Sequence, residues 1–138
     1  APVGSLLAGD EETIREARRA RKAFGGGMRQ AGIIAAASLY AFEHNVERLA
    51  EDHERAKGLA DGLREAGYGV DEPETNIVLV EVGEAEAFLQ DLAVEGVLAT
   101  PWSGSRIRLC THLDVGDAEV EGAIAAASRL LVSGEGVR

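Results

Sequence analysis

The chain has 138 residues, of which 46% are hydrophobic, and its 24 acidic and 14 basic residues give a formal net charge of −10. This charge opposes binding to nucleic acid and to anionic membrane surfaces, and no apolar run approaches the roughly 20 residues that a membrane-spanning helix needs. The composition also excludes disordered and collagen-like classes. We therefore expect a globular chain of at most one and a half domains whose partners are small molecules or proteins.

The chain carries one cysteine, Cys110, which cannot form a disulfide within the chain. The N-terminus lacks the charged region, apolar stretch and cleavage site of a secretory signal. We therefore expect a cytoplasmic protein. The chain starts without methionine at Ala1 and soon enters an apolar segment, as the middle of a longer structure would.

A short strand and a helix are expected first. Residues 3–8 are mostly apolar and are followed by Gly9, which favours a buried strand. Asp10 suits the N-cap of a helix that has acidic residues in its first turn and basic residues near its end. The three glycines at 25–27 should end this helix.

One long helix is expected from Met28 to about Ala66, ended by Gly67. Its second half has residues at steps of three and four that form one buried stripe: Val46, Leu49, Ala50, His53, Ala56, Ala60 and Leu63. Residues 31–41 are apolar or small on nearly every side and should be covered all round. A subunit or domain interface is one way to cover them.

The rest of the sequence predicts short alternating elements. We expect a strand buried on both faces at 77–80, a helix at 84–95, a brief strand at 97–99 before a turn at Pro101 and 103–104, an alternating strand at 106–110, and a last helix capped by Asp117 and packed through Val120, Ile124, Ala127 and Leu131. This order predicts an α/β layer structure with helices over one mixed sheet.

Arg108 is the clearest candidate for binding chemistry. Alternation along its strand places Arg106, Arg108 and Cys110 on the face opposite Ile107 and Leu109. An arginine fixed on a strand offers a planar fork of donors that can hold a carboxylate in two places. The alternative is a strand arginine that pairs with a structural glutamate.

A second candidate is the turn at residues 25–30, Gly-Gly-Gly-Met-Arg-Gln, which leads from a basic helix end into the start of the next helix. Free N–H groups and the helix dipole favour an anion there, and Lys22 and Arg29 would add full positive charge. Glycine runs are also ordinary turn chemistry, and basic residues at a helix C-terminus need no ligand. Both interpretations stay open.

The remaining reactive side chains point to no further site. The three histidines are too scattered for a metal cluster, and Cys110 has no neighbouring histidine in the manner of a nucleophile pair. We expect His53 to be a hydrogen-bonded core residue and His112 to order a loop through Asp114. Lys57, one of two lysines, should lie on a solvated helix face that would not lower its pKa for imine chemistry.

Four segments together resemble the low-specificity L-threonine aldolases. They are Ala-Pro-Val-Gly-Ser at 1–5, Arg-x-x-Arg-Lys at 18–22, Gly-Gly-Gly-Met-Arg-Gln at 25–30 and Arg-Leu-Cys-Thr-His-Leu-Asp at 108–114. Their order and spacing agree along nearly the whole chain. The resemblance implies the aspartate-aminotransferase fold (fold type I), pyridoxal phosphate, an amino-acid substrate, and dimers or tetramers with shared active sites.

By this resemblance, residues 1–27 would be the tail end of the large cofactor-binding domain, 28–67 a long helix between domains, and 68–138 the small C-terminal α/β domain. Arg108 matches the family arginine that binds the substrate carboxylate. Lys22 and Arg29 match basic positions near the cofactor phosphate of a neighbouring subunit's site.

The resemblance also implies what this chain lacks. The family's Schiff-base lysine lies upstream of the segment that matches Ala1, so we expect no catalytic residue and no covalent cofactor anchor in this chain, which should be inactive alone. A free-standing small-molecule-binding or dimerisation module without catalysis is the alternative.

Overall fold

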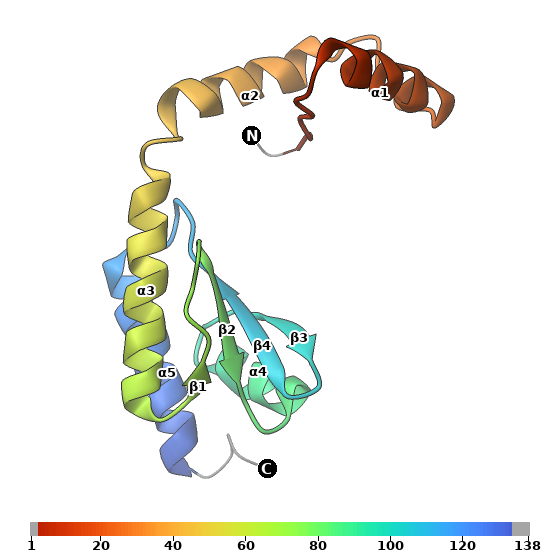
Figure 1. Ribbon diagram of the computed structural model, residues 1–138. Helices are drawn as coiled ribbons and strands as arrows, with labels where there is room; N and C mark the ends of the chain where they lie inside the picture. The colour runs from red at the N-terminus through yellow and green to blue at the C-terminus, as the bar shows by residue number, and fades with distance from the viewer. Residues whose placement is uncertain (1–2, 134–138) are drawn as a thin grey trace. The chain divides into compact units, whose positions relative to one another are not determined.

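The computed structural model describes residues 3–133. The described helices are α1 (Glu11–Ala23), α2 (Gly32–His44), α3 (Leu49–Ala66), α4 (Ala85–Val94) and α5 (Asp117–Ser133), and the strands are β1 (Gly69–Val70), β2 (Ile77–Glu81), β3 (Thr100–Ser103) and β4 (Arg106–Cys110) (Figure 1). The chain divides into two compact units, Ala1–Glu47 and Arg48–Arg138. No described helix is long and apolar enough to cross a membrane.

The N-terminal unit confirms the predicted first helix but not the predicted first strand. Asp10 caps α1, since its Oδ1 accepts a 2.7 Å hydrogen bond from the Thr13 backbone N–H, which lowers the pKa of Asp10. The chain then turns at Gly25, whose φ of +82° favours glycine. Residues 3–8 are exposed and irregular. No described strand lies beside them to supply the hydrogen bonds that a strand requires.

The predicted long helix is interrupted, because α2 ends at His44 and α3 begins at Leu49. Asn45 is the C-cap of α2, and asparagine is a weak helix former. Arg48 is the N-cap residue of α3, and its guanidinium forms two hydrogen bonds of 3.1 and 3.2 Å with the Asp52 carboxylate. Periodicity alone does not reveal this break, since both segments are helical.

The break also shortens the predicted apolar stripe. Ala56, Ala60 and Leu63 are buried, whereas Val46 and Leu49 are about half exposed. Most of the apolar surface of α2 is likewise uncovered by the described residues, with Ile33 80% exposed. Leu39, Tyr40 and Phe42 are exposed as well. The complete cover predicted for residues 31–41 is therefore absent from the described part of the chain.

In the C-terminal unit, the described strands form one sheet in the order β1-β2-β4-β3. Every pairing is antiparallel, so the prediction of a mixed sheet was wrong. Each strand runs opposite to its neighbours because β4 follows β3 in a hairpin and returns along β2. The two-residue strand β1 was not predicted, since so short a segment has no period to detect.

Helices cover one face of this sheet, and the core lies between the two layers. The register pairs Val78 with Leu109 and Val80 with Ile107, so these four buried side chains share one face, against which α3, α4 and α5 pack (Figure 1). Ile77, on the other face, is 39% exposed. The prediction that this strand is buried on both faces was therefore wrong for the described residues.

Close packing joins the helices to each other and to the sheet. A Cβ atom built on Gly62 of α3 would lie 2.4 Å from Cδ1 of Ile124 on α5, so only glycine allows this approach. Tyr68 donates a 2.9 Å hydrogen bond from its hydroxyl to the Ala127 carbonyl oxygen. Burial raises the pKa of Tyr68 to about 12. These contacts fix α5, whose predicted core residues Val120 and Ala127 are buried.

Two further boundaries differ from prediction. The brief strand expected at 97–99 lies instead at Thr100–Ser103, with Pro101 on an edge strand, where its missing N–H is tolerated. Asp117 does not cap α5; it is the first residue of the helix and pairs with Arg55. The Glu119 carboxylate accepts a 2.9 Å hydrogen bond from the Gly116 N–H just before the helix.

Candidate functional site

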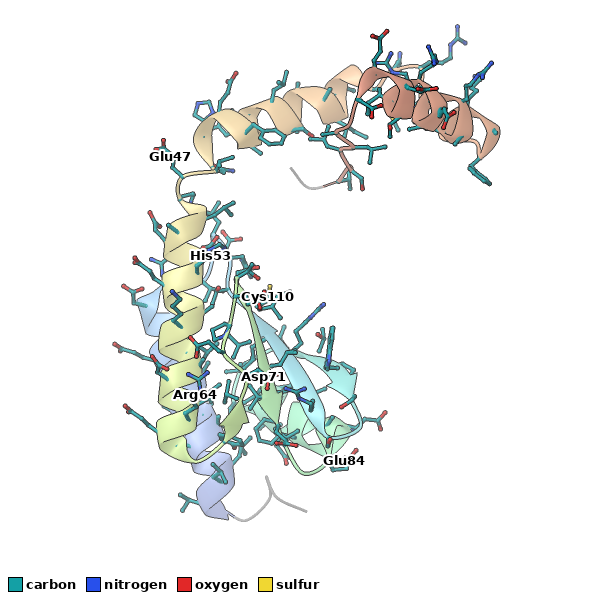
Figure 2. The ribbon with its side chains drawn as sticks, in the orientation of Figure 1. Glu47, His53, Arg64, Asp71, Glu84 and Cys110 are labelled. Carbon is teal, nitrogen blue, oxygen red and sulfur yellow. The ribbon has the colours of Figure 1, made fainter. Side chains whose placement is uncertain are left out.

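The sheet face opposite the helices carries the candidate site. Antiparallel register aligns side chains on this face in rows: Leu79, Arg108 and Thr100 form one row, and Glu81, Arg106 and Ser103 form the next. Cys110 extends the same face at the end of β4 (Figure 2). None of these side chains is fully buried. The face is therefore open within the described part of the chain.

Arg108 lies near the middle of this face and is half-buried. Its guanidinium makes no hydrogen bond and no ion pair with any residue in the range 3–133. The alternative prediction, a pair with a structural glutamate, therefore finds no partner in that range. A fixed, half-buried guanidinium without a protein partner can take a carboxylate through two parallel hydrogen bonds.

Arg106, two residues away on the same strand and face, is different. Its guanidinium pairs with the Asp71 carboxylate, which lies just beyond β1. Arg64 of α3 holds the segment that carries Asp71, by hydrogen bonds of 3.2 Å to the Val70 oxygen and 3.0 Å to the Asp71 oxygen (Figure 2). Sequence reasoning missed this pair, because 35 residues separate its members.

Hydrogen bonds from two sides fix the end of β4. Thr111 is 1% exposed, and its hydroxyl donates a 2.6 Å bond to the Asp52 carbonyl oxygen in the first turn of α3. The amide of Asn76 donates bonds of 2.7 Å to the Thr111 oxygen and 3.2 Å to Sγ of Cys110. The backbone that carries Arg108 is thus held from both α3 and the lead-in to β2.

The histidines give mixed outcomes. The Asp114 N–H donates to Nδ1 of His112 at 3.3 Å, which confirms the predicted loop contact. His53 is half-buried, and its imidazole makes no hydrogen bond to a residue in the range 3–133, so the prediction of a hydrogen-bonded core histidine was wrong. His44 bonds the Tyr40 oxygen at 2.9 Å. No group of three potential metal ligands occurs within residues 3–133.

Lys22 and Arg29 belong to the N-terminal unit, and both are exposed. A Cβ atom built on Gly27 would lie 3.2 Å from Nζ of Lys22, so this ammonium group lies over the glycine turn. Some backbone donors of the turn are occupied, since the Gly26 N–H bonds the Arg21 oxygen at 2.8 Å. The next helix, α2, begins without a side-chain cap and without an acidic residue in its first turn. This set of donors suits an anion such as phosphate.

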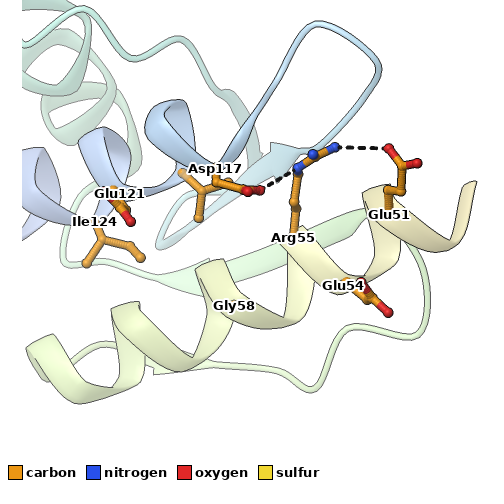
Figure 3. Close-up of a pocket in the computed structure, with 8 residues that line it drawn as sticks. Glu51, Glu54, Arg55, Gly58, Asp117, Glu121 and Ile124 are labelled. Carbon is orange, nitrogen blue, oxygen red and sulfur yellow. Dashed lines mark hydrogen bonds and ion pairs between the residues drawn. The ribbon is translucent and has the colours of Figure 1, made fainter. Parts of the chain in front are cut away.

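A pocket of about 420 Å³ lies between α3 and α5 and was not predicted (Figure 3). Arg55 crosses it, with its Nε 2.8 Å from Asp117 and its Nη1 3.7 Å from Glu51. The hydrogen bond with Asp117 raises the pKa of Arg55. Since acidic side chains already satisfy the one arginine in its lining, the pocket is an ion-pair network between two helices. Lys57 is exposed on α3, as predicted.

A family model described as beta-eliminating lyase matches residues 1–85. The chain is 49% identical to a low specificity L-threonine aldolase from Escherichia coli (strain K12) over 116 residues, which are 83% of this chain and 34% of that protein. It is 41% identical to a probable low-specificity L-threonine aldolase 2 from Arabidopsis thaliana, across 88% of this chain and 36% of that protein. The chain thus spans about a third of these relatives.

Solved structures support the fold class. An aminotransferase from Eubacterium rectale aligns with a TM-score of 0.51 at 18% identity, and the alignment covers 64% of this chain and 23% of that one. At this identity the likeness concerns the fold alone. It confirms the predicted α/β architecture, which corresponds to one part of a fold-type-I protein.

Proposed function

The chain belongs to the beta-eliminating lyase family, and on this basis we propose that it is the C-terminal part of a pyridoxal-phosphate-dependent threonine aldolase. The whole protein would cleave L-threonine and related β-hydroxy amino acids to glycine and an aldehyde. The observation that carries this proposal is Arg108, whose guanidinium is held on the open sheet face without a partner in residues 3–133. The aldolases that the chain resembles add the substrate class.

In this proposal, Arg108 binds the α-carboxylate of the amino acid through two hydrogen bonds. The strand fixes the guanidinium, and the guanidinium in turn fixes the carboxylate. This sets the rotation about the bond between the amino nitrogen and Cα, which decides which bond to Cα can break. Bound pyridoxal phosphate supplies the electron withdrawal that lets the Cα–Cβ bond break. The Thr111 and Asn76 hydrogen bonds keep the arginine in place.

Lys22 and Arg29 would hold the cofactor phosphate. Both are exposed, the Lys22 ammonium lies over the glycine turn, and α2 begins with uncapped N–H groups. Their charge and donors fit a phosphate dianion. We propose that they act in a neighbouring subunit's site of a homodimer or homotetramer, and that the lysine that anchors the cofactor lies outside residues 1–138.

The domain assignment is part of the same proposal. Residues 1–27 would complete a large domain, 28–67 would connect the domains, and 68–138 would be the small domain, with the connecting segment broken between α2 and α3. The exposed apolar face of α2 would be covered by the rest of the assembly. We place the protein in the cytoplasm.

Activity of the full-length protein tests this function. With pyridoxal phosphate bound, the protein should convert L-threonine to glycine and acetaldehyde in equal amounts. Cofactor binding without glycine formation would overturn the aldolase proposal. Residues 1–138 alone should show no cleavage, and borohydride reduction of the chain as purified, without added cofactor, should leave its intact mass unchanged. A reduced cofactor adduct on the isolated chain would contradict the placement of the anchoring lysine.

A further inference from the structure

Among residues 3–133, the open sheet face carries two arginines, and only one of them has a guanidinium without a partner. Arg106 and Arg108 project from the same face of β4, two residues and thus ~7 Å apart along the strand. Arg106 pairs with Asp71, whereas Arg108 has no partner among residues 3–133. Without Asp71, two adjacent guanidinium groups would meet any ligand on this face.

Asp71 is held where it can neutralise Arg106. Its N–H donates a 3.2 Å hydrogen bond to the Leu79 oxygen, which continues the β1–β2 pairing by one residue. Leu79 lies directly opposite Arg108 on β4, so Asp71 extends the row that contains Arg108. Its carboxylate nevertheless pairs with Arg106, in the neighbouring row. The two Arg64 hydrogen bonds reach backbone oxygens and do not involve the Asp71 side chain.

The other acid on this face does not replace Asp71. Glu81 lies opposite Arg106 on β2, but no ion pair joins them in the described structure. A Cβ atom built on Gly69 would lie 2.9 Å from Oε2 of Glu81, so this carboxylate points over β1. Asp71 is therefore the sole ion-pair partner of Arg106 in residues 3–133. The Nε atom of Arg106 is buried and has no hydrogen-bond partner in the same range.

We propose that Asp71 is a specificity-determining residue: by neutralising Arg106 it leaves the site one free guanidinium and selects amino acids that carry a single carboxylate. The inference rests on the proposed role of Arg108. A dicarboxylic β-hydroxy amino acid such as 3-hydroxyaspartate would gain a second ion pair only when Arg106 is released. Its side-chain carboxylate otherwise meets the acidic Asp71.

The variant Asp71→Asn tests this inference in the full-length protein with its cofactor. The amide keeps the shape of the side chain and leaves the Arg64 bonds to the backbone intact, so the fold should persist. Glu72→Gln is the matched control, because it removes an equal charge from the next residue, which pairs with Arg64 at 2.9 Å and not with Arg106. A double variant that combines Asp71→Asn with Arg106→Gln removes both charges of the Asp71–Arg106 ion pair.

The first readout is binding of succinate, a dicarboxylate, against acetate, measured by calorimetry. Asp71→Asn should raise the succinate affinity relative to acetate about threefold to fivefold, as expected for one partly exposed ion pair. Glu72→Gln and the double variant should match the wild type. Equal effects of Asp71→Asn and Glu72→Gln, or no change in either, would overturn the inference.

The second readout is kcat/KM for 3-hydroxyaspartate relative to L-threonine, which should rise by a similar factor in Asp71→Asn alone. If the wild-type protein cleaves no threonine, the proposed function is wrong, whereas the succinate measurement still tests Asp71. Normal threonine cleavage with an unchanged preference would overturn only the inference.

Discussion

The hydroxyl of Thr111 donates a 2.6 Å hydrogen bond to the carbonyl oxygen of Asp52 and thereby joins the end of β4 to the first turn of α3. Both residues are buried, and the carboxylate of Asp52 is in turn held by Arg48. This bond holds the chain at Thr111, three residues after Arg108 and directly after the end of β4. Stability of the unit and geometry of the candidate site therefore depend on the same contact.

Thr111→Val should weaken both properties. The substitution keeps the size of the side chain but removes the buried donor, which should lower the free energy of unfolding by about 1–3 kcal/mol. It should also raise KM for L-threonine in the full-length protein. Thr100→Val, on the exposed edge strand, is the control for stability and should leave the free energy of unfolding unchanged. Urea unfolding followed by the single tryptophan, Trp102, measures stability. Equal values for Thr111→Val and wild type would contradict the role of the bond.

Two glycines of α3 should respond oppositely to alanine. A methyl group on Gly62 would collide with Ile124, so Gly62→Ala should destabilise the chain by about 1–3 kcal/mol. Gly58 has open space around its Cα atom, and Gly58→Ala should stabilise the helix by about 0.5–1 kcal/mol. Adding Ile124→Val to Gly62→Ala should recover part of the loss. If both alanines stabilise the chain, the close approach of α3 and α5 is wrong.

Tyr68 predicts a loss of stability at alkaline pH. Its pKa of about 12 lies above the ordinary value of 10.0, so the folded state favours the neutral phenol. The resulting stability is fully present below pH 10 and is lost as the pH rises toward 12, in total about 2–3 kcal/mol. Tyr68→Phe should cost about 1 kcal/mol at pH 8, from the lost bond to Ala127, and should flatten the decline. The exposed Tyr40 supplies the control, since Tyr40→Phe should leave the decline intact. Urea unfolding at pH 8 and pH 11 measures both effects.

The two lysines should differ in their effect on the cofactor. Lys22→Gln removes the ammonium group that lies over the glycine turn and should weaken the binding of pyridoxal phosphate by the full-length protein about tenfold. Lys57→Gln removes the same charge from the exposed face of α3 and should leave cofactor binding unchanged. Fluorescence titration of the cofactor measures both. An equal effect of the two variants would point to net charge instead of a phosphate contact.

Local patterns predicted the elements that local forces decide. The N-cap at Asp10, the alternation of β4 and the apolar stripe of α5 each depend on residues close together in sequence, and the structure confirms them. The break at residues 45–48 was missed, because each side of it has a helical pattern. The segment 3–8 has the composition of a strand, but none of the described strands pairs with it.

The candidate site was predicted in part for the same reason. Alternation alone placed Arg108 opposite the core, and the structure agrees. It could not reveal that Asp71 neutralises Arg106, because that pairing depends on the order of the strands and on the Arg64 hydrogen bonds across α3 and β1. Sequence spacing therefore identified the candidate arginine, whereas the environment that leaves it free emerged only from the fold.

The most direct test of the central claim is the steady-state cleavage of L-threonine by Arg108→Lys in the full-length protein. Lysine keeps the charge but loses the two-armed contact, so kcat/KM should fall about tenfold to a hundredfold while the absorbance of bound cofactor stays unchanged. Arg106→Lys, on the same strand and face, should keep its pair with Asp71 and nearly full activity. A wild-type kcat/KM in Arg108→Lys, or an equal loss in both variants, would contradict the assignment of Arg108 to the substrate carboxylate.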